Sequence, residues 1–197
     1  MRFYLLILSL YLTSCSENKL PIIGYREIVD GKTVYAKIPE FSYLNQFGQT
    51  ISANDLKGKI HIANFFFTSC PTICPKTMRS MVRIAKHFGS DESLQYICYS
   101  IDFRKDSIPR LKEYYQKLQI DLPNFHLLHM PDQLELKRVP QKYLSIAMED
   151  STAAGGFDHS GWLLLVDQEL HIRSYCLGTD DKEVDRFIKD ISSLLNE

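Results

Sequence analysis

The sequence predicts an α/β domain with a central mixed sheet flanked by helices and an N-terminal β extension. Continuous apolar runs at residues 61–67, 94–101 and 162–166 are typical of buried strands. Helical periodicity follows the first two runs. The third leads through a short turn into another strand, at 171–177, and then into an amphipathic helix.

Size and charge limit the class of protein. The chain has 197 residues, which suits one domain with a full core. Its 23 basic and 24 acidic side chains give a formal net charge of -1, so no basic excess points to nucleic acid as a partner.

Residues 1–15 have the pattern of a signal peptide. The apolar run at 3–12 is too short to cross a bilayer as a helix, and Leu12-Thr13-Ser14-Cys15 resembles a bacterial lipobox. That resemblance implies cleavage before Cys15 and a lipid on its thiol. The alternative is an ordinary secretory signal with a chance cysteine. We expect a periplasm-facing protein of the bacterial cell envelope, anchored by lipidated Cys15, with a tether at 16–22 and the folded domain at 23–197.

The first elements of the domain are predicted to be β-strands and one long helix. Asp30-Gly31 is a strong hairpin signal, and residues 41–44 alternate as a strand does. A helix is expected from Pro75 to about Phe88, ended by Gly89. Its apolar face includes Met78 and Met81, which we assign to the core. Positive side chains along it are Arg79, Arg83 and Lys86.

Capping signals predict the later helices. Asp106 or Ser107 caps one of them, and Pro109 fits its first turn. Asp132 starts the next helix, which Pro140 is expected to interrupt.

The order of the elements is that of a thioredoxin-like fold. The last helix opens with an expected capping box, Asp180 with Glu183. A right-handed crossover joins the first two core strands as parallel neighbours. The arrangement places the 61–67 strand between the strands at 94–101 and 162–166.

Two cysteines stand at the turn between the central strand and its helix. Cys70 and Cys74 are separated by three residues, next to a helix N-terminus. The peptide dipoles there favour the thiolate, which attacks disulfides and binds metals. A structural disulfide would close a loop too small to constrain the unfolded chain much, so we expect a redox-active pair.

The remaining cysteines and two histidines are not expected to bind metal. Cys98 and Cys176 lie in strand runs on opposite sides of the central strand, so we expect buried free thiols and no disulfide between them. His126 and His129 lie in a short strand or loop, and no helical pattern brings both to one metal.

A late histidine completes the candidate site. His159 comes just before the strand at 162–166, a neighbour of the cysteine strand, so its loop is expected to face the cysteine turn. Two thiolates and one imidazole form a soft set that suits copper(I), and the nitrogen also admits copper(II). Asp158 or a backbone carbonyl is expected to accept a hydrogen bond from the second ring N–H of His159.

These motifs resemble the Sco/SenC family of copper-binding assembly factors for cytochrome c oxidase, from about residue 20 to the C-terminus. The motifs are Cys70-Pro71-Thr72-Ile73-Cys74-Pro75, Ser100-Ile101-Asp102 continuing to Asp106, and Asp158-His159-Ser160. The resemblance implies that Cys70, Cys74 and His159 are copper ligands. It also implies a domain that delivers copper to the dinuclear copper site of an oxidase subunit, or reduces the cysteines there. A copper donor or thiol reductant would act upstream.

The chain departs from the family's usual pattern beside the site. Thr72 stands where an acidic residue is usual, and Phe103 where a proline is usual. Arg104-Lys105 replaces an acidic residue followed by an arginine. These changes bear on partner recognition and redox tuning more than on metal binding.

Two other functions would use the same residues. A thiol–disulfide oxidoreductase would take Cys70 as nucleophile and Cys74 as resolving thiol, with His159 dispensable. A peroxidase of the peroxiredoxin kind would need Thr68 or Arg79 beside an activated thiol, and it leaves the second cysteine and Asp158-His159 unexplained.

Overall fold

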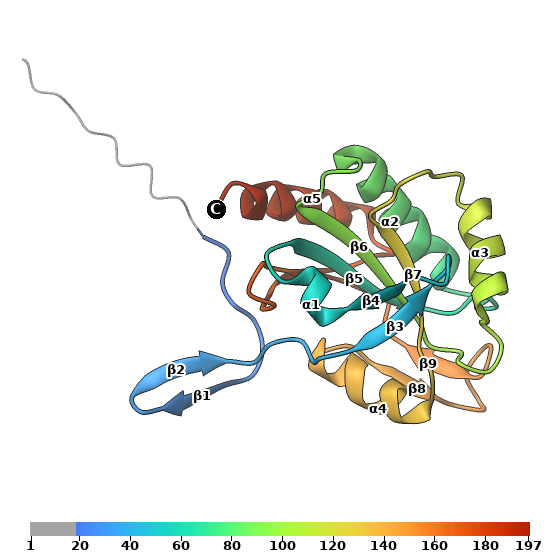
Figure 1. Ribbon diagram of the computed structural model, residues 1–197, viewed down its shortest axis with the longest axis horizontal. Coiled ribbons are helices and arrows are strands. Elements are labelled where there is room, and N and C mark those ends of the chain that lie inside the picture. The colour runs from blue at the N-terminus through green and yellow to red at the C-terminus, as the bar shows by residue number, and fades with distance from the viewer. Residues whose placement is uncertain (1–18) are drawn as a thin grey trace, which may run out of the picture.

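The computed structural model describes residues 19–197, and a seven-stranded mixed sheet forms its centre (Figure 1). The strands of this sheet are β3 (Ser42–Asn45), β4 (Thr50–Ser52), β5 (Ile60–Phe66), β6 (Leu94–Ser100), β7 (Phe125–His129), β10 (Trp162–Val166) and β11 (Ile172–Leu177). Their order is β11-β10-β5-β6-β7-β3-β4. The predicted signal peptide and Cys15 lie outside the described residues.

Five helices occur in the described part of the chain: α1 (Ala53–Leu56), α2 (Cys74–Phe88), α3 (Ile108–Lys117), α4 (Gln133–Lys142) and α5 (Asp181–Leu195). Within residues 19–197, no helix is both long enough and apolar enough to cross a membrane.

The predicted thioredoxin-like topology is confirmed. β5 lies between β6, which runs parallel to it, and β10, which runs antiparallel. The sheet extends past β6 through parallel β7 to the antiparallel pair β3 and β4. Every residue of β5 and β6 is buried, which explains why both strands are mostly apolar and show no alternation of polar and apolar residues.

Helices cover both faces of the sheet. α2 contacts α5 and β10, and a groove separates it from α3, so these three helices form one layer. Phe66 faces this layer, where its ring lies 5.5 Å from that of Tyr114 in α3. Phe65 points to the opposite face, where its ring lies 5.6 Å from Tyr143, the residue that follows α4. Side chains of β5 therefore alternate between two packed layers.

Two small hairpins lie outside the main sheet. β1 (Arg26–Val29) and β2 (Lys32–Tyr35) form the predicted hairpin, with Asp30 at φ 51 and Gly31 at φ 74 in its turn. It projects from the body of the molecule (Figure 1). The second hairpin, β8 (Ala147–Glu149) with β9 (Phe157–His159), was not predicted, because each of its strands has only three residues.

Three expectations about helix ends were wrong. Pro140 does not interrupt α4, since it lies in the last turn and the helix continues to Lys142. Ser107 occupies the N-cap position of α3 without a side-chain cap, and Asp106 points elsewhere. Asp180 caps α5, but Glu183 accepts from the backbone N–H of Leu177, outside the helix, so no capping box forms.

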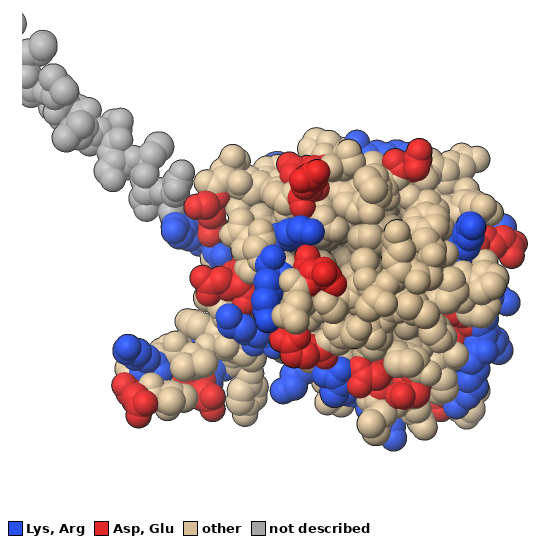
Figure 2. All heavy atoms as spheres, in the orientation of Figure 1, with Lys and Arg blue, Asp and Glu red and all other residues tan. Residues whose placement is uncertain are grey.

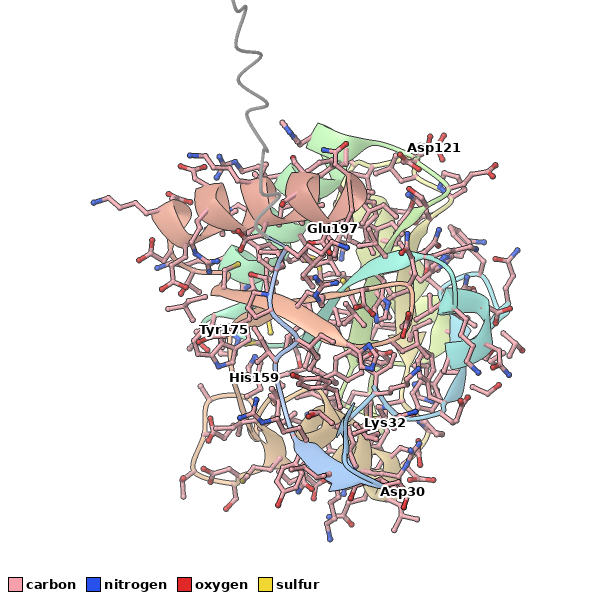
Figure 3. The ribbon with its side chains drawn as sticks, turned by 90° about the vertical axis from the view of Figure 1, so that its left-hand side faces the viewer. Asp30, Lys32, Asp121, His159, Tyr175 and Glu197 are labelled. Carbon is pink, nitrogen blue, oxygen red and sulfur yellow. The ribbon has the colours of Figure 1, made fainter. Side chains whose placement is uncertain are left out.

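The two ends of the described chain meet. The backbone N–H of Leu20 donates to Glu197 over 2.9 Å, and Arg173 of β11 also bonds both residues. Figure 3 labels Glu197 where the described chain begins. The predicted tether is thus already fixed to the domain at Leu20. Residues 19–197 contain the whole sheet and both helix layers, so this part has a complete core of its own.

Cys98 and Cys176 are buried free thiols, as predicted. Burial raises the pKa of the Cys98 thiol and raises that of Cys176 to about 12, so both stay protonated at neutral pH.

Alkylation by iodoacetamide tests this assignment. We expect Cys98 and Cys176 to react only when urea unfolds the protein, because the thiolate is the reactive form and both sulfurs are enclosed. Peptide mass spectrometry after a timed pulse would locate the label, with Cys70 as the internal positive control. Labelling of Cys98 in the native state at the rate of Cys70 would contradict the assignment.

Candidate metal centre

The first half of the candidate site is the turn between β5 and α2. The backbone N–H of Cys70 donates to the carbonyl of Phe67 over 3.2 Å, which folds the chain sharply after the strand. α2 begins at Cys74, with Pro75 in its first turn. Both cysteines are buried, with Cys70 7% and Cys74 1% exposed.

A buried carboxylate holds this turn in place. Asp106 accepts from the backbone N–H of Thr68 over 2.9 Å, from the Thr68 hydroxyl over 2.5 Å and from the Ser100 hydroxyl over 2.6 Å. Arg110 adds a contact to the Thr68 hydroxyl and an ion pair to Asp106. The end of β6 is thus joined to the residue at which the cysteine turn begins. Sequence reasoning missed this role, and its only signal was the resemblance motif that reaches Asp106.

The second half of the site is the β8–β9 hairpin. His159 ends β9, and its ring centroid lies 5.1 Å from that of Phe67. Phe157 also packs on Phe67, at 5.2 Å. Gly155 has φ +84, and a Cβ there would lie 2.7 Å from the Phe67 ring. The hairpin loop can approach this close only because residue 155 is glycine.

The three predicted ligands come together. Nε2 of His159 lies 3.0 Å from Sγ of Cys74 and 3.7 Å from Sγ of Cys70, and all three ligand atoms lie within 4.8 Å of one another. A trigonal ion with zinc-like distances of about 2.3 Å to sulfur and 2.0 Å to nitrogen would separate these atoms by about 3.7 Å. The 3.7 Å between Sγ of Cys70 and Nε2 of His159 already fits. The 3.0 Å between Sγ of Cys74 and the same nitrogen would have to increase by less than about 1 Å.

The two thiols differ in acidity. Burial acts to raise the pKa of Cys70, but hydrogen bonds from the Cys74 backbone N–H and from Thr72 outweigh it, and the pKa is lowered. Burial and the nearby Cys70 raise the pKa of Cys74 strongly. Cys70 is therefore the more acidic thiol and the more readily ionised of the two, whereas Cys74 is the thiol that holds its proton.

His159 is held neutral. Burial lowers its pKa, opposed in part by the Phe157 backbone carbonyl and the charge of Asp158. The Asp158 side chain is exposed, on the other face of β9 from His159. Of the two predicted ring partners, the carbonyl is the one placed to accept the Nδ1 proton, which leaves the Nε2 lone pair facing the thiols.

The departures from the family pattern lie around the site. The Thr72 hydroxyl is 3.6 Å from Sγ of Cys70. Arg104 forms an ion pair with Glu149 of β8 and lies 4.5 Å from the centroid of the Phe103 ring. The loop after β6 is thereby joined to the hairpin that carries His159.

Other candidate ligands lie outside this group. His126 is buried beside Asn45, whose side chain lies 3.3 Å from its Nδ1. Met78 and Met81 are buried in the core, as predicted. Among the described residues, Cys70, Cys74 and His159 are the single group of three or more His, Cys, Asp or Glu side chains close enough to share an ion.

Comparison with known proteins gives one consistent result. A family model described as SCO1/SenC matches residues 30–196. A SCO1 protein homolog of Bacillus subtilis is 24% identical over 158 residues, covering 80% of this chain and 82% of the relative.

Solved structures agree with that match. A SCO1/SenC family lipoprotein from Bacillus anthracis has a TM-score of 0.73 and 27% identity, covering 81% of this chain and 95% of that one. Yeast Sco1 with copper bound has a TM-score of 0.61 and 25% identity, covering 80% and 90%.

The anchoring role of Asp106 can be measured by urea unfolding. Replacement Asp106→Ala should lower the free energy of unfolding by about 3 kcal/mol, because it leaves the Thr68 and Ser100 donors without their charged acceptor. Ser107→Ala is the matched control, since this neighbouring side chain makes no cap, and it should change stability by less than about 0.5 kcal/mol. Equal effects of the two substitutions would refute the role.

Proposed function

The chain belongs to the SCO1/SenC family, and from this premise we propose that it is a copper metallochaperone that holds copper through Cys70, Cys74 and His159. The observation that carries the proposal is the convergence of two thiols and one neutral imidazole. Soft thiolates select copper(I), and a nitrogen ligand also suits copper(II).

The arrangement suits a cargo ion that must leave again. Three ligands leave a position open on the ion. A ligand of the partner can therefore bind the ion before Cys70, Cys74 or His159 dissociates from it. Binding of copper(I) displaces the Cys74 proton, and affinity should therefore fall as the pH falls. An intramolecular disulfide would occupy both sulfurs, so only the reduced protein can take up copper.

The proposed partners follow from the resemblance found in the sequence. Copper would pass to the copper-site subunit of cytochrome c oxidase, or the thiols would reduce the cysteines of that site. A donor of copper or a thiol reductant would act upstream. The chemistry of the site supports each exchange, because both partners would offer thiols of comparable softness.

We further propose that residues 1–15 are a lipoprotein signal and that lipidated Cys15 anchors the domain on the periplasmic side of a bacterial membrane. The lipobox-like Leu12-Thr13-Ser14-Cys15 supports this. So does the solved relative from Bacillus anthracis, which is described as a lipoprotein. A lipid at Cys15 would leave a few residues of chain before Leu20 is fixed to the domain.

Anaerobic copper(I) titration of the reduced domain, residues 19–197, tests the ligand set. Wild type should bind one ion, and the Cys70→Ala, Cys74→Ala double variant none. His159→Ala should weaken binding more than about 100-fold, beyond the loss typical of an outer-shell partner. X-ray absorption would report sulfur and nitrogen ligands.

Two variants serve as controls for this titration. Cys98→Ala removes a buried thiol outside the site, and His87→Ala removes an exposed imidazole. Neither should change stoichiometry or affinity by more than about twofold. Stoichiometric copper binding by the double cysteine variant would refute the proposal.

Thiol–disulfide exchange is a second candidate function, favoured by the opposed pKa shifts of the two cysteines. The Cys70 thiolate would attack a partner disulfide, form a mixed disulfide and release one partner thiolate. Cys74 would then lose its proton, attack the Cys70 sulfur of the mixed disulfide and release the second partner thiolate. The reaction leaves Cys70 and Cys74 joined as a disulfide and the partner reduced by two electrons. The two functions are compatible because both need the reduced pair.

Trapping with glutathione disulfide separates the roles of the thiols. Cys74→Ser should accumulate one glutathionyl group on Cys70, whereas Cys70→Ser should react at least about tenfold more slowly, because its remaining thiol is protonated. His159→Ala should retain the reaction while losing copper. Faster modification of Cys74 than of Cys70 would contradict the assignment, and intact-protein mass spectrometry measures both.

The two residues that a peroxidase would need beside the thiol, Thr68 and Arg79, do not hydrogen-bond to Cys70 in the described part of the chain. The Thr68 hydroxyl donates to Asp106 and accepts from Arg110, so it is engaged away from the thiols. Arg79 is exposed on α2, where it lines a groove. The side chains of Thr72 and His159 contact the Cys70 sulfur, and neither Thr68 nor Arg79 forms a hydrogen bond to it within the described chain.

A further inference from the structure

α2 carries a stripe of positive charge that the metal centre does not use. Its exposed cations are Lys76, Arg79, Arg83 and Lys86. Spaced by three, four and three residues, they fall within about 80° of one another around the helix. The helix contains no acidic residue, although the whole chain has a formal net charge of -1. The positive charge is therefore local.

The first cation of the stripe opposes helix stability, whereas Lys86, in the last turn, favours it. Lys76 lies in the first turn of α2, where no acidic residue is present and where the helix dipole disfavours positive charge. The pKa of Cys70 is governed by burial and by the hydrogen bonds of its own turn. Helix stability thus accounts for Lys86 but not for Lys76, and the pKa of Cys70 depends on none of the four cations.

A groove of about 520 Å³ runs along the stripe, between α2 and α3. Five apolar side chains line it: Pro75, Met78, Val82, Tyr114 and Leu118. Four cations also line it: Arg79, Arg83, Lys86 and Lys117. No acidic residue lines the groove. On the face drawn in Figure 2, by contrast, acidic and basic side chains are interspersed.

Most of this charge is available to a ligand. Arg83 pairs with Asp185 and Lys117 with Glu113, but all four side chains are about half exposed or more, so these ion pairs are weak. Within the described chain, Arg79 and Lys86 have no acidic group within 4.0 Å.

One end of the groove meets the metal centre. Pro75 lines it and directly follows Cys74. On the other side of α2, a smaller polar pocket of about 300 Å³ shares Arg79 and Arg83 and adds Lys76. A chain lying in the groove would therefore pass from a positively charged surface to the thiols.

We propose that this groove docks an acidic, amphipathic segment of the protein that exchanges copper or electrons with the site. Apolar side chains of the segment would fill the floor, and its carboxylates would face the cations of α2. The link to exchange rests on the proposed function, whereas the docking itself does not.

A protein segment fits the surface better than a lipid bilayer does. The apolar floor is recessed, with Met78 only 2% exposed, whereas a membrane-binding surface presents protruding apolar side chains. The volume lies within the range of concave binding sites, about 300–1,000 Å³. Charge complementarity would speed the encounter and fix its direction toward the thiols.

The test is binding of a synthetic peptide to the reduced domain, followed by NMR. The probe is a helical peptide of about 14 residues with leucines at i, i+3 and i+7 and glutamates beside them, and its comparison is a scrambled peptide of equal composition. We expect shifts at Val82, Tyr114 and Leu118 with the patterned peptide alone. Affinity should fall as salt rises, because rim charges are screened.

Charge reversal gives the matched variants. Arg79→Glu with Lys86→Glu should weaken the peptide at least about tenfold. Lys137→Glu with Lys142→Glu makes the same charge change on exposed residues of α4, in the opposite layer, and should alter affinity less than about twofold. If the double glutamate variant does not fold, the double variant Arg79→Gln with Lys86→Gln is used in its place.

Three results would overturn the docking surface. These are equal binding of the scrambled peptide, an unchanged affinity in the α2 variants, and capture by anionic phospholipid vesicles through the same residues with no peptide shift. The copper titration keeps the two proposals apart. Wild-type protein that binds copper normally but not the patterned peptide refutes the docking surface alone, and copper binding without Cys70 and Cys74 refutes only the metal site.

Discussion

The pairing of β10 with β5 is the constraint on which the site depends. The two strands run antiparallel with Leu163 opposite Asn64. The start of β10 therefore lies at the carboxyl end of β5, where the cysteine turn begins. Continuing this register by four residues brings His159 level with Thr68. Residues almost ninety positions apart thus meet because strand register is fixed by which side chains are buried.

The cysteine turn and the hairpin that carries His159 are held in place by different contacts. The cysteine side is joined to β6 through the buried Asp106, and Phe67 lies in the fully buried core. The histidine side is a hairpin of two three-residue strands, held by ring contacts with Phe67, by the ion pair from Arg104 to Glu149 and by the 2.7 Å hydrogen bond between the Ser145 and Ser160 hydroxyls. The donor set therefore combines a sulfur pair anchored to the main sheet with an imidazole carried on a separate hairpin.

The sequence was sufficient for the four central strands β11, β10, β5 and β6 and for the three converging side chains, but it did not place β7, β3 and β4 in the sheet. Buried strands in a parallel core are long apolar runs, and the order of elements leaves few topologies once crossovers are right-handed. What it missed depends on tertiary contacts. Asp106 stands where helix caps stand, and only the fold shows that it bonds Thr68 and Ser100 instead. Glu183 likewise bonds Leu177 in place of its own helix, and β8 and β9 are too short to show a period.

The departures from the family pattern change the electrostatics of the turn consistently. An acidic side chain near Cys70 would oppose the thiolate, whereas the Thr72 hydroxyl, 3.6 Å from the sulfur, stabilises it by hydrogen bonding. Removing that negative charge leaves the cations of α2 uncompensated at the same edge of the molecule. The loop after β6 meanwhile uses Arg104 to bond Glu149, which removes one exposed carboxylate from the surroundings of the hairpin. Relative to the family's usual residues, Thr72 and Arg104 each make the entrance more positive, whereas Phe103 and Lys105 leave its charge unchanged. The thiolate form of Cys70 is stabilised, and an acidic partner is attracted more strongly to this edge of the molecule.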